Sequence, residues 1–270
     1  MLLSIRFIWG AVYLRKTFRE NGYEVKPFSH LYYMLVSIIL IYVLKEAGLA
    51  LLTPIVDRRI EQVWSPDMWA EKKLKTPMNM VNLIWYSISS AIGIYLCWNS
   101  PVIPTIFLGS QPLGYTMRMY PGTEEIPYMP FYYMFQMGSR TYSLINSIVR
   151  ERKRPDFHEM MLHHLATLFA MLYSYFTNTH MIGVIILLIH DWGDWSYRVA
   201  YFWRDLLPNH NPLFVSIIGL YCFNFVRCIQ QPIWFISVYI NGVWKNPDVH
   251  KDPNFHKFFG DGEIFYACIF

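Results

Sequence analysis

Long apolar stretches, separated by short polar connections, run through most of this chain. A helix needs about 20 mostly apolar residues to cross the roughly 30 Å hydrocarbon core of a membrane. Six stretches come near that length and predict transmembrane helices at residues 31–52, 80–98, 131–149, 160–176, 181–203 and 213–240. Gln136 and Arg140 interrupt the third, and Pro232 in the sixth predicts a kink after Gln231.

The segments outside these spans divide the chain further. Residues 1–28 predict an interfacial N-terminal helix, because the apolar part, residues 1–14, is too short to span and basic residues follow it. A signal peptide and an uncleaved presequence-like helix are the alternatives. Residues 29–240 form the predicted membrane domain, and residues 241–270 a C-terminal tail. The proline-rich connection 99–130 predicts an ordered, non-helical cap or re-entrant loop.

Composition supports a membrane protein. Of the 270 residues 54% are hydrophobic and only 16% are charged, against about 25% charged in soluble domains. The net charge of +4 is spread over the connections, which argues against nucleic-acid binding. The four cysteines lack CxxC or zinc spacing. Basic residues concentrate in the first, third and fifth connections, so those connections are expected to face the cytosol or its equivalent.

Ionisable residues inside two of the predicted spans are the candidates for function. A charged group at membrane depth costs several kcal/mol unless it is paired. The fourth span carries His163 and His164, and the fifth carries His190, Asp191 and Asp194. At 3.6 residues per turn, the three residues of the fifth span lie on one face of a helix.

Three interpretations fit these residues. They could form hydrogen bonds between helices that fix packing alone. They could bind zinc or iron, although one His pair and one His-Asp box are few ligands for a membrane metalloenzyme, and we expect no metal. Acid-base or nucleophilic catalysis fits better, because imidazole can attack a thioester or deprotonate an amine while a carboxylate orients the ring.

The same residues stand in a longer pattern. Residues 153–167 read KRPDFHEMMLHHLAT, followed by Ser174-Tyr175, Asn178, Gly183, His190-Asp191 and Asp194. This pattern resembles the Lag motif of ceramide synthases, within the TLC-domain family (TRAM/Lag/CLN type), and the similarity extends over residues 128–240. The resemblance implies a TLC-type barrel of about six transmembrane helices, all α-helical, that transfers a fatty acyl group from acyl-CoA to the amine of a sphingoid base.

The resemblance also implies roles for individual residues. His163 or His164 would carry the acyl group, His190 would act as base, and Asp191 and Asp194 would orient the histidines and receive the amine. Four residues would bind substrate: Thr167, Tyr175, Asn178 and Arg227. Four basic residues of the third connection are weaker candidates for the CoA phosphates: Arg150, Arg152, Lys153 and Arg154. The alternative is that these basic residues only keep the connection on the cytosolic side of the membrane and bind no CoA.

The pattern departs from the family in ways that keep a second function open. Met181 stands where the family usually has Arg, and the family's helix after the one containing Arg227 has no apolar equivalent here beyond residues 264–270. The alternative is therefore a catalytically silent TLC protein, a lipid-binding or structural subunit of a larger membrane complex. The family implies the endoplasmic reticulum, and the alternative fits the mitochondrial inner membrane. Expected partners are membrane lipids, acyl-CoA and sphingoid base if the protein is active, and protein subunits if it is not. No bound cofactor is expected.

Overall fold

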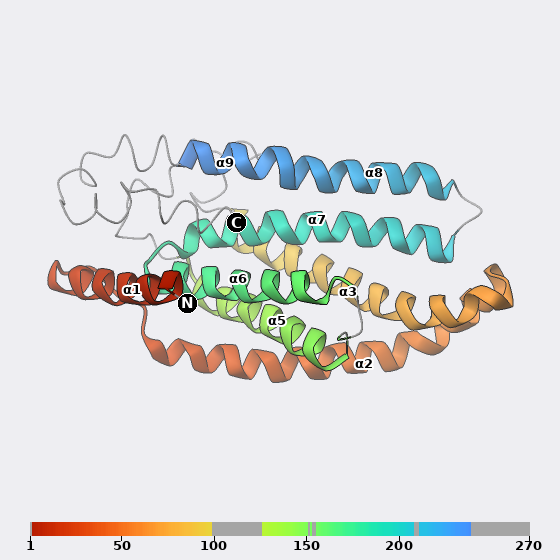
Figure 1. The fold of residues 1–270 in the computed structure, drawn as a ribbon, viewed down its shortest axis with the longest axis horizontal. Coiled ribbons are helices and arrows are strands. Elements are labelled where there is room, and N and C mark those ends of the chain that lie inside the picture. Colours follow the sequence, from red (N-terminus) through yellow and green to blue (C-terminus); the bar gives the residue numbers. More distant parts are fainter. Residues whose placement is uncertain (1, 99–125, 151, 153–154, 208–210, 239–270) are drawn as a thin grey trace. The chain divides into compact units, whose positions relative to one another are not determined.

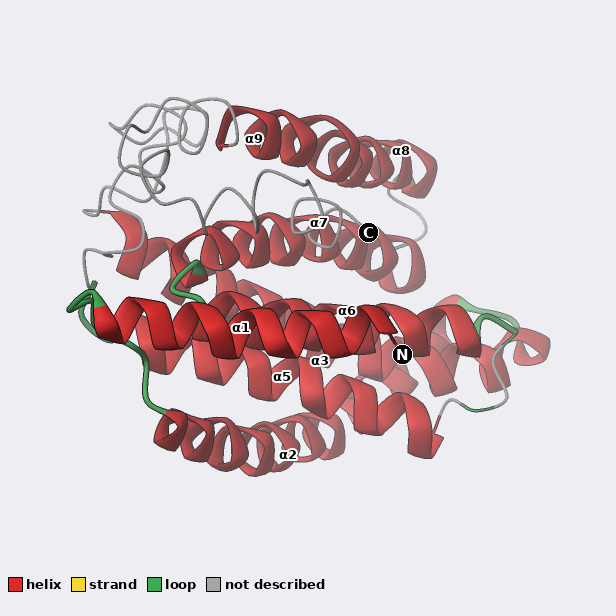
Figure 2. Cartoon of the chain, turned by 60° about the vertical axis from the view of Figure 1, so that its left-hand side comes forward, coloured by secondary structure: helices red, strands yellow, loops and turns green. Residues whose placement is uncertain are grey.

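The computed structural model describes residues 2–98, 126–150, 152, 155–207 and 211–238. In these ranges the chain forms helices and no strand (Figure 2), which confirms the predicted all-α class. The elements are α1 (Leu2–Glu20), the 3₁₀ turn η1 (Phe28–His30), α2 (Leu31–Val63), α3 (Pro66–Trp98), α5 (Met129–Arg150), α6 (Phe157–Phe176), α7 (His180–Leu206), α8 (Pro212–Asn224), the π-helical turn η3 (Phe225–Gln230) and α9 (Gln231–Val238).

The chain is an integral membrane protein. Among the described residues, the segments long and apolar enough to cross a membrane are Phe28–Val63, Pro66–Trp98 and Leu213–Ile233. The other predicted spans are helical too, as α5, α6 and α7, but they are not among these segments. Their crossing of the membrane therefore stays a prediction, and so does the count of six spans.

The prediction of a non-helical connection between the first two spans, at residues 53–79, is mostly wrong. Residues 53–79 are helical except at Trp64 and Ser65, where α2 ends and α3 begins. Both helices continue through the charged residues that end the apolar runs, with Pro54 and Pro77 inside them. Hydropathy detects the part of a helix that lies in lipid and misses its extension into water. Pro66 begins α3, where its fixed φ suits the first helical turn.

The described helices belong to two compact units. The first comprises residues 1–38, 96–185 and 234–270, and the second residues 39–95 and 186–233. The predicted division at residues 28 and 240 follows charge and hydropathy instead, and it stays a prediction. The proline-rich connection lies outside the described residues up to residue 125, and its last two residues already belong to α5. The tail from residue 239 onward also lies outside them.

In the first unit, α5 packs along α6 (Figure 1), α1 contacts α6, and η1 contacts α5. The backbone of α5 comes close to the start of α2 at Gly138. A Cβ atom there would lie 2.7 Å from Ser37 Cβ and 3.1 Å from the Met34 carbonyl oxygen, so only glycine fits without displacement. Arg15 of α1 donates from Nη1 to the Lys26 carbonyl oxygen at 2.9 Å, and its guanidinium lies over the Phe28 ring at 4.3 Å. The chain between α1 and η1 is thereby tied to α1.

In the second unit, apolar packing joins the ends of α2 and α7. Val56, Ile60 and Leu206 are buried together, with Trp64 and Phe202 packed against them. A second close contact joins α8 to α7 at Gly219, where a Cβ would lie 2.7 Å from Ala200 Cβ. These contacts set the positions of the helices that carry the candidate acids.

The last predicted span is helical but not uniformly so. The break in α-helical geometry is the π-helical turn Phe225–Gln230, ahead of Pro232 rather than after Gln231. A π turn often marks a functional position because it widens the helix locally. Arg227, a candidate site residue, lies within it.

Candidate functional site

The His pair lies on α6, in the first unit. Consecutive residues of a helix point about 100° apart, and the two rings accordingly differ in surroundings. The side chain of His163 is exposed, whereas His164 is half-buried with Nε2 3.4 Å from Ser147 Oγ of α5. The ring centroids are 5.7 Å apart. His164 therefore faces α5, and His163 is the more accessible imidazole.

Three other motif residues of the first unit contact the chain itself. Thr167 donates from Oγ1 to the His163 carbonyl oxygen at 2.8 Å. Tyr175 is fully buried, hydrogen-bonds through Oη to His30 Nδ1, and stacks on Tyr133 with centroids 5.6 Å apart.

Asn178 ends the turn after α6 in left-handed backbone geometry, with φ 60°. It donates from Nδ2 to the Glu24 carbonyl oxygen at 2.7 Å. Tyr175 and Asn178, predicted to bind substrate, thus hold the segment that leads from α1 to α2.

His190 lies on α7 in the second unit, and its hydrogen bond identifies its tautomer. Nδ1 is 2.8 Å from the Ile186 carbonyl oxygen, one turn earlier. A carbonyl oxygen only accepts, so Nδ1 carries the proton and donates. In the neutral ring the basic lone pair is then at Nε2, which is the atom able to take a proton.

The two carboxylates beside His190 have different partners. Asp191 is 1% exposed, and its Oδ2 accepts from Ser89 Oγ of α3 at 2.6 Å. Asp194 is half-buried, and its Oδ1 accepts from Arg227 Nη2 at 2.9 Å. A Cβ atom at Gly193 would lie 3.4 Å from Arg227 Nε, an ordinary contact distance, so the Arg227 side chain lies against α7 at this glycine. Each acid is paired with a donor on a different helix.

His190, Asp191, Asp194 and Arg227 thus lie in the second unit, and His163, His164, Thr167, Tyr175 and Asn178 lie in the first. Ser89 was not among the sequence candidates, because a serine within an apolar run carries no distinguishing signal. Within the described ranges, no group of three or more His, Cys, Asp or Glu is arranged to hold a metal ion.

The basic connection after α5 is described only in part. Arg150 and Arg152 are exposed, and Arg152 donates from Nε to the Ile148 carbonyl oxygen at 2.5 Å. Cations near the C-terminal end of a helix offset its partial negative charge. Lys153 and Arg154 lie outside the described residues.

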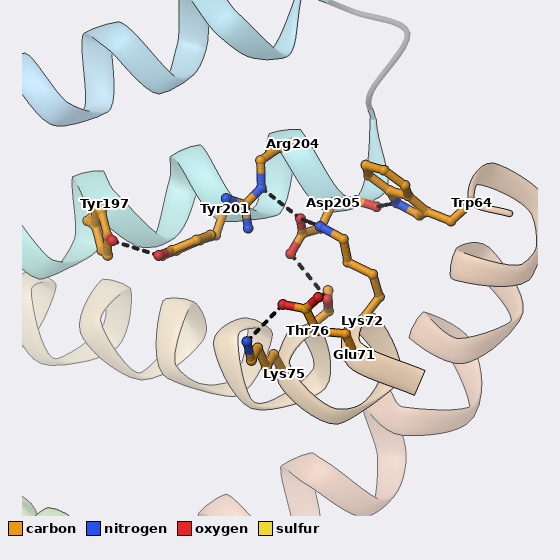
Figure 3. Close-up of polar contacts among 9 residues, drawn as sticks. All are labelled: Trp64, Glu71, Lys72, Lys75, Thr76, Tyr197, Tyr201, Arg204 and Asp205. Carbon is orange, nitrogen blue, oxygen red and sulfur yellow. Dashed lines mark hydrogen bonds and ion pairs between the residues drawn. The ribbon is translucent and has the colours of Figure 1, made fainter. Parts of the chain in front are cut away.

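A polar cluster that sequence analysis missed lies where α3 and α7 meet in the second unit (Figure 3). Asp205 is 2% exposed and accepts at Oδ1 from Lys72 Nζ at 2.6 Å and at Oδ2 from Thr76 Oγ1 at 3.2 Å. Arg204 Nε also donates to Oδ1, at 2.9 Å. Burial raises the pKa of the Asp205 carboxyl, but the bonds from Arg204 and Lys72 lower it by more, so the net pKa lies below its ordinary value.

The end of α7 is capped by Arg59 of α2 and by Trp64, the residue after α2. Trp64 donates from Nε1 to the Asp205 carbonyl oxygen at 2.8 Å, and Arg59 donates from Nε to the Leu206 carbonyl oxygen at 3.1 Å. The last carbonyl groups of a helix have no partner within it. These two bonds supply partners from the end of α2 and from the residue that follows it.

Comparison with known proteins agrees with the motif. The model of the family TRAM_LAG1_CLN8, the TLC domain, matches residues 75–266. Ceramide synthase LOH2 of Arabidopsis thaliana is 30% identical over 165 residues, covering 61% of this chain and 53% of that protein. Ceramide synthase LOH1 of the same plant is 23% identical over 172 residues, covering 63% and 54%. Ceramide synthase 3 of Mus musculus is 30% identical over 140 residues, covering 48% and 35%. The match spans about half the length of these two Arabidopsis proteins.

Proposed function

This chain belongs to the TLC-domain family, and from that premise we propose that it is an N-acyltransferase that moves a fatty acyl group from acyl-CoA to the amine of a sphingoid base. It is a ceramide synthase-like TLC protein. The observation that carries the proposal is the hydrogen bond from His190 Nδ1–H to the Ile186 carbonyl oxygen, which leaves the basic lone pair at Nε2. Asp191 and Asp194 follow His190 on the same helix.

The reaction divides into two transfers. In the first, an imidazole nitrogen of His163 or His164 attacks the thioester carbonyl, the carbon–sulfur bond breaks, and CoA leaves as the thiol after taking a proton. The exposure of His163 and the contact of His164 with Ser147 favour His163 as the acyl carrier.

In the second transfer, the neutral amine of the sphingoid base attacks the acyl-imidazole carbon. The amide bond forms, the carbon–nitrogen bond to imidazole breaks, and a base takes the amine proton. His190 Nε2 is the proposed base. Asp191 and Asp194 are the carboxylates proposed to attract the ammonium form of the substrate before it loses its proton.

Binding of CoA is proposed at the basic end of α5. Arg150 and Arg152 are exposed there, and guanidinium groups pair with phosphate through two hydrogen bonds. Lys153 and Arg154, the next basic residues in the sequence, complete the proposed CoA-binding set.

The proposed location is the endoplasmic reticulum membrane, by family, with the mitochondrial inner membrane as the alternative. Imaging of the tagged protein against markers of both membranes decides between them.

One observation favours the second candidate, a TLC protein without catalysis that binds lipid or supports a complex. Tyr175 and Asn178, two motif residues, form hydrogen bonds to the chain's own N-terminal segment. Residues of the motif can therefore serve the fold alone. This function predicts stoichiometric partner proteins in mild detergent and no acyl transfer.

The test is the intact mass of the purified protein after incubation with acyl-CoA of several chain lengths, with fragmentation to locate the modified residue. The expected result is an acyl adduct on His163 or His164 that disappears when a sphingoid base is added, with N-acyl product released. His163→Ala and His164→Ala are compared with His158→Ala, an exposed histidine of the same helix. The absence of adduct and product at every chain length would overturn the proposal in favour of the second function.

A further inference from the structure

The buried carboxylate of Asp191 depends on a partner from another helix. A carboxylate away from water costs several kcal/mol unless donors reach it. Ser89 of α3 is 2% exposed and lies 2.6 Å from Asp191 Oδ2 through its hydroxyl oxygen. An ionised carboxylate only accepts, so the Ser89 hydroxyl donates. This is a short hydrogen bond to a charged acceptor, the stronger kind.

The Ser89 hydroxyl forms a hydrogen bond to a side chain of a second helix. A helical serine often returns its hydroxyl to the carbonyl oxygen four residues earlier. Ser37 and Ser87 do so, donating to the Tyr33 and Leu83 carbonyl oxygens at 2.6 and 2.8 Å. Ser89 donates to a side chain of α7. The bond to Asp191 therefore joins two helices, whereas the hydroxyl bonds of Ser37 and Ser87 stay within one helix.

Two further hydrogen bonds hold α3 and α7 in this register. Trp195 Nε1 donates to Ser87 Oγ at 2.9 Å, and Arg198 donates to Asn79 Oδ1. Asp191, Trp195 and Arg198 follow one another at intervals of four and three residues, which places them along one face of α7. The Ser89 contact is thus one of a row, and the other members keep the serine opposite Asp191.

We propose that Ser89 is a positioning residue for the acyl transfer, whose hydroxyl fixes the orientation of the Asp191 carboxylate. This inference rests on the proposed function, in which Asp191 receives the substrate amine. Ser89 itself touches no reacting atom. Losing a hydrogen bond to a charged group corresponds to about a ten- to hundredfold change in rate. The loss is expected in kcat, because the KM for acyl-CoA depends on other groups.

The test compares variants that differ by one hydroxyl. Threonine and valine have nearly the same shape, so Ser89→Thr keeps the donor and Ser89→Val removes it at equal volume. Ser90→Ala is the matched control, since Ser90 Oγ is buried and has no hydrogen-bond partner among the described residues. Each purified variant is assayed with palmitoyl-CoA and sphinganine, and its thermal unfolding midpoint is measured in the same detergent.

The expected result is a kcat at least tenfold lower for Ser89→Val than for Ser89→Thr, with equal KM for acyl-CoA and parent-like kcat in Ser90→Ala. Equal kcat in the threonine and valine variants would overturn the inference while the parent remains active and the proposed function stands. An inactive parent would overturn both. If neither the threonine nor the valine variant folds, the kcat of Ser89→Ala is compared with that of Ser90→Ala by the same criterion.

Discussion

Lys72 Nζ lies 2.6 Å from Asp205 Oδ1 in the second unit, and both side chains are nearly buried, at 11% and 3% exposure (Figure 3). An ion pair inside a protein loses hydration that its mutual attraction only partly restores. Removing one partner is then more costly than removing the pair, because the other charge stays buried. The Lys72 ammonium also lies over the Trp64 ring at 4.3 Å, so its position is fixed on two sides.

Replacement of Lys72 tests this pair. Lys72→Met keeps most of the side-chain volume but leaves the Asp205 carboxylate short of a donor, and we expect about 3–5 kcal/mol of destabilisation. Lys73→Met is the control, because Lys73 pairs with Glu61 at the surface, where an ion pair contributes about 1 kcal/mol or less. Thermal unfolding in detergent measures both. A midpoint lowered equally by the two substitutions would contradict the buried-pair interpretation.

Asp205 also predicts how stability depends on pH. Its pKa is lower in the folded protein than the ordinary 3.8, so the unfolded chain binds a proton more readily. The stabilisation is present above pH 3.8 and is lost as the pH falls through the lower folded pKa. At pH values below 3.8, the unfolding temperature of the parent should therefore decrease more steeply with falling pH than that of Asp205→Asn, because the asparagine side chain binds no proton. Parallel pH profiles for the two proteins would refute this assignment.

Gly138 is predicted to be irreplaceable at its contact with α2. A Cβ atom would meet Ser37 Cβ at 2.7 Å and the backbone of Met34 and Ile38 at 3.1 and 3.2 Å. Gly138→Ala should destabilise by about 1–3 kcal/mol, as overpacking does. Gly48→Ala is the matched control, because its Cβ would lie 3.6 Å from Val81, an ordinary contact, and alanine favours the helix. Comparable losses in both variants, measured by thermal unfolding, would count against the close approach.

Asn178 combines two effects that substitution can separate. Its φ of 60° is unfavourable for most side chains, and its Nδ2 donates to the Glu24 carbonyl oxygen. Both Asn178→Gly and Asn178→Ala lose the side-chain hydrogen bond, but glycine adopts left-handed geometry freely, whereas for alanine that geometry costs about 1–2 kcal/mol. The alanine variant should therefore unfold at the lower temperature. Identical midpoints would mean that the backbone geometry contributes nothing.

Asp194 and Arg227 are predicted to be energetically coupled. Both are partly exposed, at 26% and 21%, so the coupling should lie within about 0.5–3 kcal/mol. A double-mutant cycle with Asp194→Asn and Arg227→Gln, read by thermal unfolding, measures it. Additive losses from the two substitutions would show that the contact contributes no stability of its own.

The fold is predictable from sequence where a single physical property decides the outcome. Apolar runs of membrane length identified the helices, and the His and Asp positions identified the family. The charged ends of α2 and α3 were missed, because hydropathy cannot distinguish a polar helix from a polar connection. Helix formers such as Glu61, Glu71 and Lys72 continue these helices beyond the apolar runs.

The partners of the candidate acids could not be predicted, because they depend on which helix faces which. Nothing in an isolated serine distinguishes Ser89, which donates to Asp191, from Ser87, which donates to its own helix. The pairing of Asp205 with Lys72 joins positions 133 residues apart. Such contacts follow from packing, which periodicity along one helix does not specify.

The cap that Trp64 and Arg59 place on the last carbonyl groups of α7 restricts how that helix can move. Sliding α7 along its axis by a single residue is a translation of about 1.5 Å, enough to stretch both hydrogen bonds beyond their normal length. His190 lies 15 residues before Asp205, about 22 Å along the same rigid rod. The depth of the candidate base relative to α2 is therefore set from the far end of its helix, and adjustments during a reaction must come from side-chain rotation rather than from helix translation.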